Sequence, residues 1–143
     1  MTRIIIPRLP ENFERKSFRV GSTAISMGKL VKLNTSTGRL DVCGTTSAGA
    51  NAIGVIDYDH NYVAKNSGTT SVTAGDPINV ALFGRSVNLV SGGTFLAGVF
   101  VQQGTSGAVI AEATATTRSV DTIGIALEAS TASGQTVEIL TIR

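Results

Sequence analysis

The chain has 143 residues and a mass of 14.7 kDa, with 42% hydrophobic residues, 15% charged residues and a formal net charge of +2. This length fits one compact domain, and the hydrophobic share argues against disorder. No apolar run approaches the roughly 18 residues that a membrane-spanning helix needs, so we expect no membrane partner.

Residues 1–20 differ in composition from the rest of the chain. They hold five cations against two acids, whereas the remaining residues hold seven cations against eight acids. Pro7 and Pro10 disfavour regular helix and favour an extended chain. We therefore predict an extended N-terminal arm over residues 1–20, whose apolar side chains lie against its own domain or a partner. The alternative is a first edge strand packed on its own domain.

Residues 21–143 are predicted to form a single all-β domain. Short alternating apolar stretches, such as residues 29–33 and 39–43, are separated by clusters of Gly, Ser, Thr and Asn. Val, Ile and Thr favour strands, while Gly and Ser favour turns. This pattern is typical of a small β-barrel or sandwich.

The domain contains an internal repeat over approximately residues 25–84 and 95–143. The stretch 53–56 (IGVI) returns as 123–126 (IGIA), and earlier glycine and valine positions match at the same offset. The first copy carries about eleven extra residues. The repeat predicts a fold of two similar halves that close on one another around an apolar core, because each half is too small to bury a face alone.

Gly54 and Gly124 occupy equivalent positions inside the two repeated apolar strands. A glycine inside a strand weakens it unless it permits a bulge, a bend or the close approach of another backbone. We therefore interpret both as structural positions.

The extra segment of the first copy, residues 58–73, contains both tyrosines of the chain. Tyr58, His60 and Tyr62 lie within five residues of one another. Tyrosines on a loop can anchor a binding surface because they bury much area at little entropic cost. The alternative is that they cover the edge of their own barrel.

The sequence gives little support for a catalytic or metal-binding site. Asp57, Asp59 and His60 could bind a cation weakly, but no calcium-binding loop with enough oxygen ligands is present, and a solvated polar loop is expected instead. Cys43 has no activating neighbour in sequence, and no Gly-x-Ser-x-Gly motif occurs, so we expect a packed thiol. The domain has no basic stripe for nucleic acid. We expect no enzymatic activity, cofactor, metal or direct nucleic-acid partner.

Four segments carry a family resemblance: GKLVKL at 28–33, AIGV at 52–55, AGDPINVALFG at 74–84 and TIGIALEA at 122–129. With them the sequence, over roughly residues 20–143, resembles the small β-barrel head decoration, or capsid cement, proteins of tailed bacteriophages. The resemblance implies a structural protein, made in the host cytoplasm, that binds the outer surface of the expanded head as a homotrimer. It would clamp neighbouring subunits of the major capsid protein.

For that function the candidate capsid contacts come from the arm and from the extra segment. Cations would meet acidic capsid patches, and aromatic side chains would act as apolar anchors. An alternative function is a carbohydrate- or receptor-binding β module of a phage tail structure, with glycan binding through the two tyrosines. A small hydrolase is the weakest alternative. The candidate contacts are Arg3, Arg8, Phe13, Arg15, Lys16, Phe18, Arg19, Tyr58, His60 and Tyr62.

Overall fold

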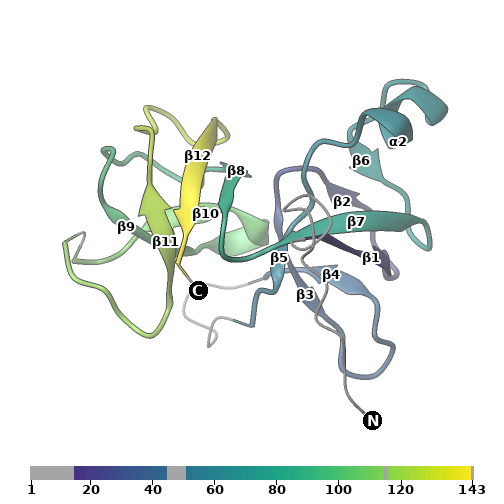
Figure 1. The fold of residues 1–143 in the computed structure, drawn as a ribbon, viewed down its shortest axis with the longest axis horizontal. Helices are drawn as coiled ribbons and strands as arrows, with labels where there is room; N and C mark the ends of the chain where they lie inside the picture. The colour runs from purple at the N-terminus through teal and green to yellow at the C-terminus, as the bar shows by residue number, and fades with distance from the viewer. Residues whose placement is uncertain (1–14, 45–50, 115, 143) are drawn as a thin grey trace, which may run out of the picture.

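The computed structural model describes residues 15–44, 51–114 and 116–142. These residues form three antiparallel sheets, one short helix and one 3-10 turn (Figure 1). The predicted all-β fold class is therefore confirmed. No helix in the described part of the chain is long and apolar enough to cross a membrane.

The first half of the chain builds a five-stranded sheet with strand order β1-β7-β5-β3-β4. A separate two-stranded sheet, β2 with β6, and the helix α2 lie beside it (Figure 1). The bounds are β1 Arg15–Arg19, β2 Ile25–Ser26, β3 Leu30–Leu33, β4 Leu40–Val42, β5 Gly54–Val55, α2 His60–Lys65, β6 Ser71–Val72 and β7 Pro77–Leu82.

The second half builds a five-stranded sheet of its own, with strand order β10-β9-β11-β12-β8. The 3-10 turn η1 precedes β10. The bounds are β8 Ser86–Val90, β9 Phe100–Gln103, η1 Thr105–Gly107, β10 Val109–Ala111, β11 Thr122–Ala126 and β12 Thr136–Thr141.

The two sheets have the same strand order, so β1, β3, β4, β5 and β7 correspond to β8, β9, β10, β11 and β12. An isolated parallel bridge joins the edge strands of each half, Val20 to Leu40 in the first and Ser91 to Val109 in the second. Each half therefore curls into a small, nearly closed barrel. In the described ranges no strand of one sheet pairs with the other, so the two halves pack against one another as separate sheets and do not share one closed sheet.

Residues 15–19 belong to the domain and not to an arm. They form β1, which pairs with β7 from Arg15 opposite Ala81 to Arg19 opposite Pro77. The alternative of a first strand holds for this segment, while residues 1–14 of the predicted arm lie outside the described residues. Both copies of the repeat consequently begin earlier than predicted, at β1 and β8. The sequences RKSFR and SVNLV have no identical residue at equivalent positions, so the sequence alone does not reveal this correspondence.

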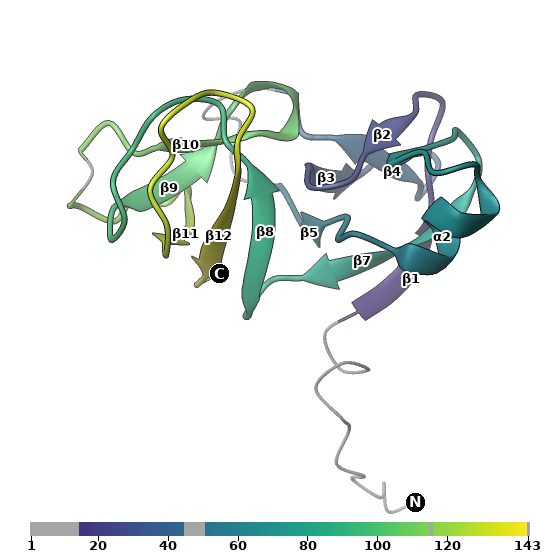
Figure 2. The ribbon, with the colours of Figure 1, turned by 90° about the horizontal axis from the view of Figure 1, so that it is seen from above.

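Two apolar clusters hold the halves. One lies inside the first barrel and includes Val31, Leu40 and Val80, all fully buried. The other joins the interior of the second barrel to buried side chains of the first half, among them Leu30 and Val55. The halves thus share a packed interface, and Figure 2 shows them side by side with β8 between β12 and β5.

The connection between the halves is held by a residue of the last strand. Residues 83–85 link β7 to β8, and the Thr141 hydroxyl of β12 accepts hydrogen bonds from the Gly84 amide at 2.8 Å and the Arg85 amide at 3.0 Å. The same hydroxyl donates to the Arg85 carbonyl at 2.6 Å. One side chain therefore fixes the short linker at three points.

Gly54 and Gly124 have the same structural role, as the sequence predicts. A Cβ on Gly54 would collide with the Ala81 carbonyl oxygen of β7, and a Cβ on Gly124 would collide with the equivalent Leu140 carbonyl oxygen of β12. Of the three roles that glycine can have inside a strand, close approach of a neighbouring backbone is the one common to both positions.

Candidate functional site

The predicted contact residues of β1 lie at the edge of the first sheet. Lys16 and Phe18 pair with residues of β7 whose side chains point into the barrel, but Lys16 is exposed and Phe18 is half-buried. The Lys16 ammonium lies 5.6 Å from the centre of the Phe18 ring, in cation–π geometry. Arg19 is exposed, and its Nη1 donates to the Gly75 carbonyl at 2.9 Å. Lys16 and Arg19 are therefore accessible to a partner.

Arg15 has a different role because it forms an ion pair. Its Nη2 lies 3.1 Å from Asp57 Oδ2, and the two side chains are 33% and 17% exposed. A partly exposed pair of this kind contributes only about 0–1 kcal/mol. It does, however, tie β1 to the segment that follows β5, and so positions the residues around Tyr58.

Asp59 caps helix α2. Its Oδ1 accepts hydrogen bonds from the amides of Asn61 at 3.0 Å and Tyr62 at 3.1 Å, which satisfies two otherwise free donors of the helix start. Asp57 and Asp59, the predicted weak cation ligands, thus both have protein partners. Among the described residues, no group of three or more His, Cys, Asp or Glu side chains could hold a metal ion.

The two tyrosines of the extra segment have different environments. The Tyr62 hydroxyl donates to Asp76 Oδ2 at 2.7 Å and accepts from the Thr73 amide at 2.9 Å, and its ring packs against the core of the first barrel. Tyr62 therefore covers the edge of its own barrel. Tyr58 is 54% exposed, and its ring contacts the His60 ring edge-on, with centroids 4.7 Å apart.

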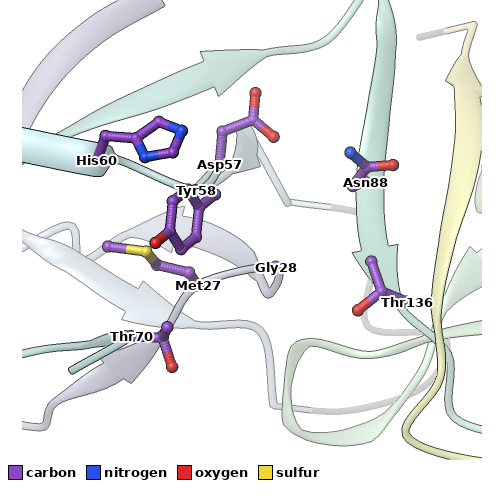
Figure 3. A pocket seen from close by; sticks show the side chains of 8 residues that line it. All are labelled: Met27, Gly28, Asp57, Tyr58, His60, Thr70, Asn88 and Thr136. Atoms are coloured by element: carbon purple, nitrogen blue, oxygen red, sulfur yellow. The ribbon is translucent and has the colours of Figure 1, made fainter. Parts of the chain in front are cut away.

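Tyr58 and His60 line a cleft between the halves, with a volume of about 530 Å³. Figure 3 shows Tyr58, His60 and Asp57 on one side and Asn88 and Thr136 on the other. The lining is mixed, with an aromatic ring, a carboxylate, an amide and a hydroxyl, which suits a small polar ligand or a loop of a partner. Asn88 and Thr136 were not predicted, because they are isolated polar residues on strands of the second half.

Cys43 is a structural thiol. It is fully buried, and burial raises the pKa of the Cys43 thiol to about 11, although the positive charge of Lys32 partly opposes the rise. Since the thiolate is the reactive form, the thiol is protonated and unreactive at neutral pH.

This environment predicts slow chemical labelling of Cys43. At pH 8 the folded protein should react with a disulfide reagent such as dithionitrobenzoate far more slowly than the urea-unfolded protein, because only unfolding exposes the thiol and restores its ordinary pKa. The absorbance of the released thiol measures both rates. Equal rates in the folded and unfolded protein would contradict the burial of this side chain.

No known protein family matches the sequence, and no curated protein matches it. Among solved structures, the chain is similar to the N base of the head fiber gp8.5 in bacteriophage phi29, with a TM-score of 0.56 and 16% sequence identity. The similarity covers 89% of this chain and 93% of that chain. At this identity it shows a shared fold. The architecture of this chain is thus a tandem pair of five-stranded barrels, and the base of that phage head fiber is a solved structure with a similar fold.

Proposed function

We propose that this chain is a structural protein of a bacteriophage head. The observation that carries the proposal is the fold shared with a head fiber base, which extends over nearly the whole of both chains. Little of either chain therefore lies outside the shared fold. The virion is then the expected location of the protein.

More specifically, we propose a decoration or cement function. The protein would bind the outer surface of the expanded head as a homotrimer, contact neighbouring subunits of the major capsid protein, and act without catalysis or a cofactor. Lys16 and Arg19 are exposed cations on β1, and Lys16 could face acidic capsid patches. Arg3, Arg8 and Phe13, the other candidate contacts in the arm, lie outside the described residues. Many copies on one shell would add weak contacts into firm attachment.

The alternative of glycan binding through both tyrosines has less support. The Tyr62 hydroxyl is hydrogen-bonded to Asp76 and Thr73, and its ring packs against the core. Tyr58 is therefore the accessible tyrosine. We therefore place Tyr58 and His60 in the inter-barrel cleft, and Lys16 among the proposed capsid contacts.

The decoration proposal predicts saturable binding to expanded heads. Purified protein is mixed with undecorated expanded heads of the phage that encodes it, and bound copies and the temperature of head disruption are measured. We expect a fixed number of copies per head and a higher disruption temperature. Deleting residues 2–14 should weaken binding by about tenfold or more, equivalent to about 1.4 kcal/mol, because the arm would lose its contacts.

The control is Arg118→Glu, which changes an exposed cation in the second half without touching β1. It should bind as the unmodified protein does. Absence of binding to heads would contradict the decoration function, whereas unchanged binding after the deletion would contradict the arm as a contact.

A further inference from the structure

An apolar row crosses the outer face of the first sheet. Val55 of β5 lies opposite Leu30 of β3 and opposite Ala81 of β7, so these three side chains point to the same face. We call them the Val55 row. All three are 0% exposed, and they belong to the cluster that includes the interior of the second barrel. The second half of the chain therefore covers this row.

The second sheet carries an equivalent row. Ile125 of β11 lies opposite Phe100 of β9 and opposite Leu140 of β12, at the positions that correspond to the Val55 row. We call these three the Ile125 row. Here Leu140 is 38% exposed, and Phe100 and Ile125 are only half-buried. The same apolar face is thus covered in the first half and partly open in the second.

The second half covers the Val55 row with the side of its barrel that lies between the edge strands β8 and β10. Two hydrogen bonds mark this contact. The Val90 amide of β8 donates to the Gly28 carbonyl at 2.9 Å, and the Gly107 amide, just before β10, donates to the Cys43 carbonyl at 2.6 Å. We call this side the β8–β10 seam.

Glycines on the two contacting surfaces also show that the surface is covered in one half and open in the other. A Cβ on Gly28 would lie 3.2 Å from Val90 Cγ2, and a Cβ on Gly107 would lie 2.6 Å from Val42 Cγ2. The equivalent glycines have nearly the same φ, 88° at Gly98 and 67° at Gly38 against 86° and 72°. Their Cβ atoms would meet none of the described atoms within 4 Å. Both halves therefore have the backbone conformation that this contact needs, but within one chain only one pair of surfaces is in contact.

The counterpart of the β8–β10 seam in the first half is the side between β1 and β4, which we call the β1–β4 seam. Its edges carry Arg19 and Arg39, both exposed, where the second half has Val90 and buried Ala108. Residues 15–84 hold seven cations and four acids, whereas residues 85–142 hold two cations and four acids. A first half would therefore be attracted electrostatically to the second half of another copy.

We propose that the Ile125 row of one copy binds the β1–β4 seam of a second copy, as the Val55 row binds the β8–β10 seam within the chain. The contact joins two different surfaces, so it runs head to tail and can close into a ring. Closure after three copies rests on the proposed function; the contact itself rests on the equivalence of the two halves.

Two variants block one surface each. Leu140→Lys places a cation in the Ile125 row, where it would face the arginines of the seam. The double variant Arg19→Glu with Arg39→Glu reverses the charge of the β1–β4 seam. We expect the unmodified full-length chain to form a closed oligomer by sedimentation velocity and each variant to be monomeric. An equal mixture of the two variants should form a one-to-one complex, because one intact row and one intact seam remain.

Arg118→Glu is again the control, since this exposed residue belongs to neither surface, and it should remain oligomeric. Circular dichroism checks folding, and Leu140→Ser replaces Leu140→Lys if the charge prevents it. A monomeric unmodified chain at high concentration, or a mixture that stays monomeric, would overturn the proposal. Head binding is measured separately, so an oligomer that fails to bind heads contradicts the decoration function alone.

Discussion

Deleting residues 2–19 is expected to unfold the first half of the protein, whereas deleting residues 2–14 retains all of β1. The longer deletion removes a strand paired with β7 over five residues, the Arg15–Asp57 ion pair and the half-buried Phe18 ring. With about 0.5–1.5 kcal/mol for each hydrogen bond, the loss reaches a large part of the roughly 5–15 kcal/mol that stabilises a typical domain.

Thermal unfolding followed by circular dichroism compares the two deletions. The shorter one should retain a cooperative transition, and the longer one should lose it or shift it far down. Equal melting temperatures would show that β1 contributes little to the first barrel. The shorter deletion is accordingly the suitable variant for testing the arm in head binding, since loss of binding by the longer one would reflect loss of fold.

The substitutions Gly54→Ala and Gly124→Ala are each expected to destabilise the protein by about 1–3 kcal/mol or more. In both cases the new methyl group would meet a carbonyl oxygen of the neighbouring strand, so relief requires movement of a paired backbone. Urea unfolding measures the change. The control is Gly93→Ala, because a Cβ there would meet nothing described within 4 Å and its φ is not positive.

Near-neutral effects at Gly54 and Gly124 would contradict the close approach of the strands. A large effect at one position alone would indicate that the two barrels differ in their tolerance. In either case the control separates backbone crowding from the general effect of replacing glycine, which in other settings stabilises by reducing the freedom of the unfolded chain.

The fold class and the duplication could be predicted because turns and strand interiors depend on local sequence. Equivalent turn glycines have closely similar conformations, such as φ 87° at Gly75 and 89° at Gly134. The correspondence of β1 with β8 could not be predicted, because it does not depend on local sequence similarity. The two strands are equivalent because β1 pairs with β7 and β8 pairs with β12. For the same reason the sequence does not predict that each half closes on itself. In each half the closure depends on one isolated bridge between residues that are far apart in sequence.

The candidate site was predictable in part. The extra segment does line a cleft, but sequence could not distinguish Tyr58 from Tyr62, which are the same residue type four positions apart. The difference comes from Asp76, fourteen residues beyond Tyr62, whose carboxylate accepts a hydrogen bond from the Tyr62 hydroxyl. The opposite wall of the cleft comes from Asn88 and Thr136, whose approach depends on the packing of one barrel on the other.

The three hydrogen bonds of Thr141 to the linker also impose an order of events on the growing chain. The strands of the first barrel all precede the linker in sequence, but the side chain that holds Gly84 and Arg85 comes from β12, more than fifty residues later. A ribosome-bound chain that has completed its first barrel therefore still lacks the side chain that holds the linker in place. The Ile125 row is likewise complete only when Leu140 has been added, so the proposed self-association would have to wait until both barrels have been made.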